Sequence, residues 1–146
     1  MCVCVVGPNL VINQPNDLLD GMDEWCTKTH GKSGLTRAVR ESKIDIKEAE
    51  KRMLAFLHEN KIATRKCPLA GNSVHIDRMF LNKEMKLFTN HLHYRIIDVS
   101  SLKELGERWY PDVCRFNKKY PHRALDDIRE SIEELKFYRS KMFKDL

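Results

Sequence analysis

Apolar residues recur along this chain at two spacings, and each spacing predicts one kind of secondary structure. Short apolar runs bounded by Gly, Pro or polar residues occur at 1–6, 10–12, 67–70 and 94–99, and such runs are typical of strands. Elsewhere apolar residues recur every three or four positions, which is the spacing of one helix face. Because strands and helices follow one another in this order, we expect an α/β fold, with a single domain over residues 1–146.

Three of the expected helices begin with residues that can cap a helix. Asn16 can cap the first, Asp45 with Glu48 forms a capping box for the second, and Ser101 with Glu104 forms another for a later helix. The apolar side chains that we expect these helices to bury are Leu18, Leu19, Met22, Trp25, Cys26, Ala49, Met53, Phe56, Leu57, Leu102, Leu105 and Trp109. Segment 30–34, with two glycines, indicates a mobile loop. It is not a phosphate-binding P-loop, because the required Gly and Lys spacing is absent.

The stretch 120–134 opens the last helix. Pro121 suits a helix entry, because its fixed φ and missing N–H cost little there. An apolar stripe with helical spacing follows and is expected to face a core. Its members are Leu125, Ile128, Ile132 and Leu135.

Two adjacent carboxylates at the start of this helix differ in their neighbours. Positions three and four apart are adjacent on a helix, so Asp127 lies beside the small residues Ala124 and Ser131, whereas Asp126 lies beside Arg129. This leaves room over Asp127 for a ligand and predicts a solvated Asp126. The alternative is a merely charged helix start, since acidic residues stabilise the positive end of the helix dipole.

A third carboxylate, Asp77, follows the strand at 67–70 and the polar turn at 71–73, close to the start of a helix. Ligands of α/β proteins bind at loops that follow strand ends, so Asp77 lies where a metal-binding carboxylate could project. The alternative is again an acidic residue that stabilises the helix dipole. The apolar side chains that we expect this helix to pack are Met79, Phe80 and Leu81.

The composition narrows the class of protein only slightly. A formal charge of +5 and a pI of about 9.0 permit a nucleic-acid partner without requiring one. Five cysteines, an odd number without zinc-type pair spacing, predict reduced thiols in an intracellular protein. The apolar run at 1–6 is too short to cross a membrane, so we expect no membrane association.

Three motifs occur in a fixed order along the chain: Ala-Gly-Asn-Ser-Val-His-Ile-Asp at 70–77, His-Tyr-Arg-Ile-Ile-Asp-Val-Ser at 93–100 and His-Arg-Ala-Leu-Asp-Asp at 122–127. Together they resemble the oligoribonucleases, which are DEDDh 3′→5′ exonucleases on the ribonuclease-H-like fold. The resemblance extends through 7–12, 22–26, 30–35 and 102–109, and so covers nearly the whole chain from Gly7 onward.

The resemblance implies a two-metal phosphodiester hydrolysis of short single-stranded RNA to mononucleotides. In the family four carboxylates hold two divalent ions, Mg²⁺ or Mn²⁺, which prefer oxygen ligands. Asp77 and Asp127 match two of these carboxylates, and His122 matches the general base that activates water. A neutral imidazole near physiological pH suits that task.

The resemblance also implies residues that bind substrate. Trp25 and Ser73 match residues that line the substrate groove, and His30 matches one that approaches a phosphate. Family members are homodimers in which a tyrosine of the partner subunit stacks on a base. Tyr94 takes that position here, and the adjacent Arg95 could meet a terminal phosphate.

One family motif has no counterpart in this sequence. The family's first strand ends in Asp-x-Glu, which supplies the other two carboxylates, and no aspartate of this chain begins that motif. We therefore expect an N-terminally shortened member that lacks the first two central strands of the sheet. The alternative function is a catalytically inactive form that binds short RNA or dimerises with the full-length protein. We expect a cytoplasmic location, or a mitochondrial one if a leader was lost with the N-terminus.

Overall fold

The structure is a computed structural model that describes residues 5–117 and 124–144. Within these ranges the chain forms two units, one made of 5–67 with 81–92 and the other of 68–80, 93–117 and 124–144. Each unit is described by itself below. The expectation of one domain over 1–146 stays a prediction.

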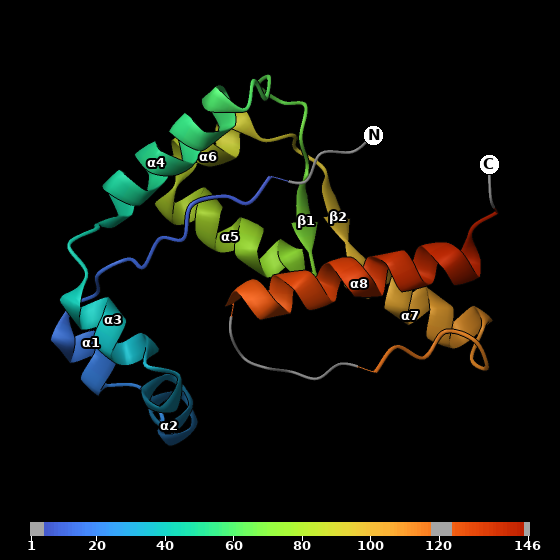
Figure 1. Cartoon of the computed structure of the whole chain (residues 1–146), viewed down its shortest axis with the longest axis horizontal. Helices are drawn as coiled ribbons and strands as arrows, with labels where there is room; N and C mark the ends of the chain where they lie inside the picture. Colours follow the sequence, from blue (N-terminus) through green and yellow to red (C-terminus); the bar gives the residue numbers. More distant parts are fainter. Residues whose placement is uncertain (1–4, 118–123, 145–146) are drawn as a thin grey trace. The chain divides into compact units, whose positions relative to one another are not determined.

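The first unit is helical in its described part. Its helices are α1 (Asn16–Asp20), α2 (Glu24–Ser33), α3 (Leu35–Glu41), α4 (Ile46–Glu59) and α6 (Lys86–His91). Helices α2 and α3 pack together, and α4 packs against α6 (Figure 1). The expected strand at 10–12 is reduced to an isolated parallel bridge between Ile12 and Ile44. Of the expected strand at 1–6, residues 5 and 6 are exposed and not in a strand, and the rest lies outside the described residues.

Several expectations for this unit are wrong. Leu18 and Trp25, which are expected to be buried, are exposed. The helix expected to begin under an Asn16 cap and to run on to Cys26 is divided, because α1 ends before Gly21 and Asp23 begins α2 by accepting a hydrogen bond from the Cys26 N–H at 2.7 Å. The expected mobile loop at 30–34 is instead the last turn of α2 followed by Gly34. Gly34 ends the helix with φ 80°, a left-handed conformation that glycine adopts without strain.

Helix α4 begins and packs as its sequence predicts. The Asp45 carboxylate accepts a hydrogen bond from the Glu48 N–H at 2.7 Å, which satisfies one of the free donors at the helix start. Ala49 and Leu57 are buried, and Phe56 is half-buried on the same face. The start of α4 and its buried face are therefore both determined by residues close together in the sequence.

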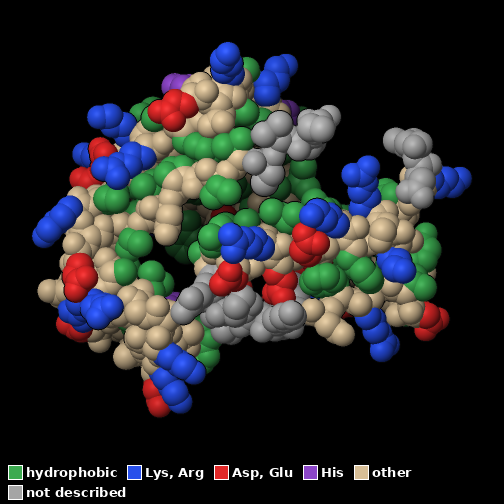
Figure 2. Space-filling model, in the orientation of Figure 1, with side chains coloured by type: hydrophobic (Ala, Val, Ile, Leu, Met, Phe, Trp, Pro, Cys, Tyr) green, Lys and Arg blue, Asp and Glu red, His purple; other side chains and the backbone are tan. Residues whose placement is uncertain are grey.

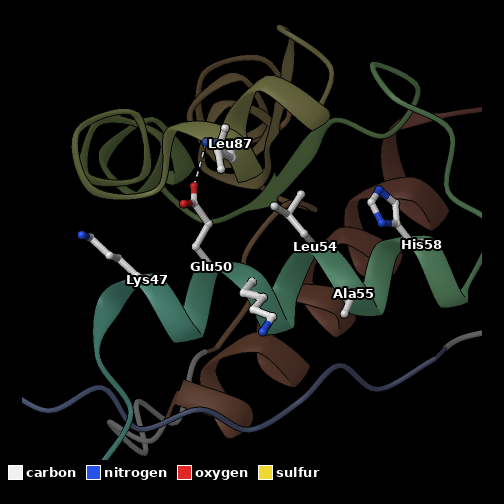
Figure 3. Close-up of a pocket in the computed structure, with 7 residues that line it drawn as sticks. Lys47, Glu50, Leu54, Ala55, His58 and Leu87 are labelled. Carbon is white, nitrogen blue, oxygen red and sulfur yellow. Dashed lines mark hydrogen bonds between the residues drawn. The ribbon is translucent and has the colours of Figure 1, made fainter.

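A carboxylate of α4 also begins α6. Glu50 Oε1 accepts hydrogen bonds from the N–H groups of Leu87 at 2.7 Å and Phe88 at 3.0 Å, so it does for α6 what a capping residue does (Figure 3). An open pocket of about 610 Å³ lies beside this contact. Its lining residues are Lys47, Glu50, Lys51, Leu54, Ala55, His58 and Leu87.

The second unit is built on two parallel strands, β1 (Leu69–Gly71) and β2 (Ile96–Asp98). Their register pairs Leu69 with Ile96 and Gly71 with Asp98, so both strands end at the same edge (Figure 1). Helix α5 (Val74–Glu84) follows β1, α7 (Val99–Trp109) follows β2, and α8 (Ala124–Met142) contacts both α7 and β1. The first seven residues of α5 belong to this unit.

Two expected boundaries near β2 are wrong. Tyr94 and Arg95 precede the strand, and Val99 already begins α7. The cap of α7 is Asp98, whose carboxylate accepts from the Ser100 N–H at 3.0 Å, and Ser101, the expected cap, lies inside the helix. Asp98 caps α7 in place of Ser101 because β2 ends at Asp98 and α7 begins at the next residue.

The core of the second unit contains the buried residues Val99, Cys114 and Tyr138, with Leu102, Phe116, Leu135, Phe137 and Met142 packed around them. The expectation that the apolar stripe of α8 faces this core is wrong for its first three members. Leu125, Ile128 and Ile132 are 47%, 56% and 42% exposed, and apolar side chains reach the surface along α8 between charged ones (Figure 2). The fully buried residues of α8 are Glu134 and Tyr138, while Leu135, Phe137 and Met142 of the same helix pack on the core.

The expected packing of α5 is also wrong in part. Met79 and Phe80 are exposed, and Leu81 is half-buried. Val74, Arg78 and Leu81 lie at helical spacing on the less exposed face of α5, whereas Met79 and Phe80 lie off it. None of the helices in the described part of the chain combines the length and apolar character that a membrane crossing requires.

Two helical glycines provide a test of this packing. A Cβ added at Gly106 of α7 would lie 2.9 Å from Cys114 Cβ, whereas a Cβ added at Gly31 of α2 would meet no atom within 4 Å. Gly106→Ala should therefore destabilise by about 1–3 kcal/mol through overpacking, despite the better helix propensity of alanine. The matched change Gly31→Ala should stabilise by about 0.5–1 kcal/mol. Urea unfolding measures both, and shifts of the same sign would contradict the packing described.

Candidate active site

The turn after β1 fixes the start of α5 against the junction of β2 and α7. Ser73 has φ 50°, a left-handed conformation that is uncommon for a residue with a side chain. Its N–H donates to Asp98 Oδ1 at 2.9 Å and lies 3.0 Å from Ser100 Oγ, which compensates for the unfavourable backbone. Its carbonyl accepts from the Ile76 N–H at 3.0 Å and so begins α5. The start of α5 is thus fixed to the junction of β2 and α7.

The carboxylate of Asp98 is the common acceptor at this edge of the sheet. Oδ1 accepts from the N–H groups of Ser73 and Ser100, and Oδ2 lies 3.4 Å from His75 Nδ1. Asp98 is paired with Gly71 in the sheet register, so its side chain stands beside the end of β1. One side chain therefore joins the ends of both strands.

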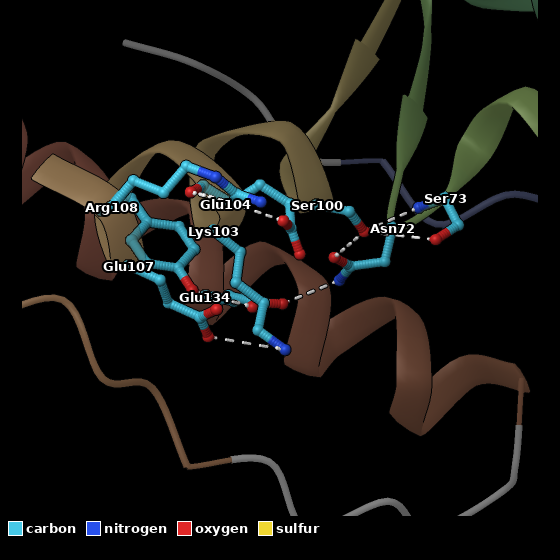
Figure 4. A network of polar contacts seen from close by, with 9 residues as sticks. Asn72, Ser73, Ser100, Lys103, Glu104, Glu107, Arg108 and Glu134 are labelled. Carbon is cyan, nitrogen blue, oxygen red and sulfur yellow. Dashed lines mark hydrogen bonds and ion pairs between the residues drawn. The ribbon is translucent and has the colours of Figure 1, made fainter. Parts of the chain in front are cut away.

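The amide of Asn72 joins the same turn to α8 (Figure 4). Its Nδ2 group donates to Ser131 Oγ and to Glu134 Oε2, both at 2.8 Å. Its Oδ1 atom accepts from Ser100 Oγ at 3.1 Å. Both amide hydrogens and the carbonyl oxygen are used, so the orientation of the Asn72 side chain is fully specified.

Glu134 is the charged group at the centre of these contacts, and it is only 1% exposed. In addition to Asn72, the Tyr138 hydroxyl donates to Glu134 Oε1 at 3.2 Å. Burial, together with the adjacent Glu134 carboxylate, raises the pKa of Tyr138 well above its ordinary value. Tyr138 therefore remains a hydrogen-bond donor throughout the physiological pH range.

The two carboxylates expected to bind metal lie in this second unit, at the starts of two helices. Asp77 is in the first turn of α5 and exposed, and Asp127 is in the first turn of α8 and half-buried. The Ser131 hydroxyl donates to the backbone oxygen of Asp127 at 2.9 Å, as the i, i+4 spacing predicts. Asp126 is half-buried as well, and its carboxylate pairs with Arg129 at 3.5 Å. His122 lies outside the described residues.

The donor chemistry of Asp77 and Asp127 suits a hard divalent ion, since carboxylate oxygens are the ligands that Mg²⁺ and Mn²⁺ prefer. In residues 5–117 and 124–144 no group of three or more His, Cys, Asp or Glu side chains is arranged to hold a metal. The carboxylate oxygens of Asp77 and Asp127 thus suit the family's ions. That they form part of a complete set of metal ligands stays a prediction.

The expected substrate-binding residues belong to both units. Trp25 and His30 lie on α2 of the first unit, with ring centroids 6.3 Å apart and the rings nearly perpendicular. In the second unit Tyr94 is 73% exposed, stacks on His93 at 4.6 Å between centroids, and has the Arg95 guanidinium 5.4 Å from its ring centre. An exposed aromatic ring beside a cation is suited to stacking on a base near a phosphate.

The supporting residues Asp98, Ser100 and Glu134 have no role predicted from the sequence, although Asp98 and Ser100 lie inside the second motif. A signal for Glu134 exists in the sequence: Asp127, Ser131, Glu134 and Tyr138 follow helical spacing and form a polar face. Such a face is ordinarily interpreted as solvated, and only the tertiary contact with Asn72 shows that it is buried.

Comparison with known proteins gives the class to which these elements belong. A family model described as Exonuclease (RNase_T) matches residues 4–135, which is most of the chain. The match and the parallel strands with flanking helices confirm the α/β, ribonuclease-H-like exonuclease fold that the sequence predicts. The fold is that of the exonuclease family.

The relatives narrow this class. The chain is 57% identical over 140 residues to a human protein named mitochondrial oligoribonuclease, and 59% identical over 140 residues to a probable oligoribonuclease of Dictyostelium discoideum. It is 52% identical over 139 residues to an oligoribonuclease of Pseudomonas fluorescens. These matches cover 94% of this chain and 59%, 72% and 77% of the three relatives. The chain belongs to the oligoribonuclease family, and it spans less than two thirds of the human relative's length.

The raised pKa of Tyr138 provides a test of the buried contacts around Glu134. Because the pKa of Tyr138 is raised in the folded protein, its contribution to stability is present below the ordinary tyrosine pKa, about 10, and is lost as the pH rises above it. Tyr138 should therefore ionise only well above the ordinary tyrosine pKa. Ultraviolet titration of the tyrosinate band, with Tyr138→Phe as control, measures this. Loss of an early component in the variant would contradict the assignment.

Proposed function

We propose that this chain provides the catalytic framework of a 3′→5′ exoribonuclease, which releases mononucleotides from short single-stranded RNAs. The observation that carries the proposal is the position of Asp77 and Asp127. Each lies in the first turn of a helix, and the two helix starts are joined through the Asn72–Ser73 turn at the end of β1. Family membership supplies the reaction class, because the curated relatives are named oligoribonucleases.

Asp77 and Asp127 are the residues of this chain that would hold Mg²⁺ or Mn²⁺. When bound, the family's two ions supply an activated water and stabilise the leaving oxygen. The chain's own contribution is to hold the two carboxylates at fixed points. His122, five residues before Asp127 in the sequence, is proposed as the general base.

Substrate binding is proposed to rest on stacking and on charge. Tyr94 would stack on a base, and Arg95 would meet a phosphate, which recognises RNA without regard to sequence. Trp25, His30 and Ser73 would line the groove. The family's use of a partner's tyrosine implies a homodimer with two equivalent contacts.

A second function, RNA binding or dimer formation without catalysis, is favoured by one observation. No aspartate in the 146 residues begins an Asp-x-Glu motif, so the two further carboxylates of the family site are not supplied by that motif here. Incubation of the chain with short labelled RNA and Mg²⁺ or Mn²⁺ separates the two functions, because only the first releases mononucleotides. A cytoplasmic or mitochondrial location is proposed, the second because the human relative is named as mitochondrial.

The two adjacent carboxylates of α8 provide the first test. Asp127→Ala should remove most Mn²⁺ binding, a loss of at least about tenfold in affinity, because it deletes a proposed ligand. Asp126→Ala is the matched control, and it should have little effect because the Asp126 carboxylate pairs with Arg129. Titration followed by the electron paramagnetic resonance of free Mn²⁺ measures both. Equal effects of the two changes would contradict the assignment of Asp127.

The exposed tyrosine provides the second test. Tyr94→Ala should weaken binding of a short RNA by about 1–3 kcal/mol, the contribution of one stacked base. Tyr110→Ala is the control, because Tyr110 is exposed in the same unit but follows α7. Fluorescence anisotropy with a labelled trinucleotide measures the change. Undiminished binding by the Tyr94 variant would exclude Tyr94 from the RNA site.

A further inference from the structure

The two proposed metal carboxylates are held by separate helices, so something must fix the distance between them. Asp77 is on α5 and Asp127 is on α8, and these helices are separated by β2 and α7 in the sequence. A metal site tolerates little variation in the position of its ligands, because metal–oxygen distances are fixed within a few tenths of an ångström. The contacts that join the two helix starts are therefore part of the site.

On the α8 side, the connection is a directed chain of hydrogen bonds. Asn72 Nδ2 donates to Ser131 Oγ at 2.8 Å, and the Ser131 hydroxyl donates in turn to the backbone oxygen of Asp127 at 2.9 Å. Because Ser131 has a single hydroxyl hydrogen, its donation to Asp127 leaves the oxygen lone pairs for Asn72. The chain thus runs in one direction, from the turn to the residue that bears the carboxylate.

On the α5 side, the connection is the backbone itself. Asn72 is followed by Ser73, whose carbonyl accepts the Ile76 N–H and begins α5, one residue before Asp77. The Ser73 N–H is held by Asp98, which fixes the left-handed backbone of the turn. A rotation of this turn would therefore move the start of α5 and the Asn72 amide together.

Glu134 makes the Asn72 contact specific. It is buried, it accepts the second Asn72 hydrogen at 2.8 Å, and an ionised carboxylate can only accept. The nitrogen of the Asn72 amide must therefore face α8, and its oxygen must face Ser100. Glu134 disfavours the flipped amide, which would place the Asn72 oxygen against the Glu134 carboxylate.

From these contacts we infer that Asn72 is a positioning residue of the proposed metal site, which sets the separation of Asp77 and Asp127 through Ser131 and Glu134. The inference rests on the proposed function of the two carboxylates. Asn72 contacts neither the metal nor the RNA in this account. Its effect is exerted through the position of Asp127 relative to the start of α5.

The test compares Mn²⁺ affinity in variants of the whole chain. Asn72→Ala removes the connection without adding a ligand and should weaken Mn²⁺ binding by about 10–100-fold, as changes in residues that orient metal ligands do. Ser131→Ala breaks the chain at its second step, keeps α8 intact because alanine favours helix, and should weaken binding in the same direction. If Asn72→Ala does not fold, Ser131→Ala decides the question.

Tyr138→Phe is the matched control. It removes a buried hydrogen bond to the same Glu134 carboxylate, but this bond lies within α8 and joins no other element. It should lower the melting temperature as a buried hydrogen bond does and leave Mn²⁺ affinity unchanged. Circular dichroism establishes that each variant is folded at the titration temperature.

The outcomes separate the inference from the proposed function. Weaker binding in Asn72→Ala and Ser131→Ala, with Tyr138→Phe unchanged, supports the inference. Unchanged binding in the first two variants, or an equal loss in the third, overturns it and leaves the proposed function intact. If the unsubstituted chain binds no Mn²⁺, or binds it equally after Asp77→Asn and Asp127→Asn, the proposed function fails and the inference fails with it.

Discussion

The second unit depends on the hydrogen bonds of one amide, that of Asn72. With both its hydrogens and its oxygen engaged, this side chain joins the end of β1 to α8 through Ser131 and Glu134, and to α7 through Ser100. Two three-residue strands bury little apolar surface, so the sheet alone cannot hold the helices in place. The apolar core packs α8 against α7, and the polar contact with its defined direction joins α8 to the turn after β1. The carboxylates proposed to bind metal follow this turn on α5 and lie at the start of α8.

A buried polar network of this kind gives specificity more than stability. Taking Glu134 out of water costs free energy that its hydrogen bonds largely recover, and an apolar contact of equal volume would stabilise as well or better. An apolar contact would not fix the rotation of α8, however, because it has no preferred direction. The cost of leaving Glu134 without its donor is high, which makes the observed orientation of the helix the favoured one.

The parts of the fold that could be predicted from sequence are those that local chemistry determines. Asp45 begins α4 and Gly71 ends a strand because the capping side chain and the turn residues are adjacent in the chain. The buried face of α8 could not be predicted, since Leu125, Ile128 and Ile132 form the better apolar stripe and yet are exposed. Glu134 is buried because of a partner 62 residues away, and no local pattern indicates such a contact.

The same reasoning explains which residues of the site could be predicted. Asp77 and Asp127 are candidates that follow from spacing and from the family resemblance, whereas Asp98 and Glu134 make contacts with residues distant in the chain. Family motifs point to groups that touch substrate or metal more readily than to the groups that orient them. The supporting contacts become visible only when strand ends and helix starts are placed together.

The central claim, that the contact between Asn72 and Glu134 holds the turn on α8, is tested most directly by a double-mutant cycle in urea. Asn72→Asp alone places two carboxylates against each other. With Glu134→Gln added, the new amide can donate to the carboxylate introduced at position 72, while its oxygen accepts from Tyr138. The double variant should be more stable than Asn72→Asp alone, with a coupling free energy of about 1–3 kcal/mol. Free energies of unfolding that add to within about 0.5 kcal/mol would contradict it.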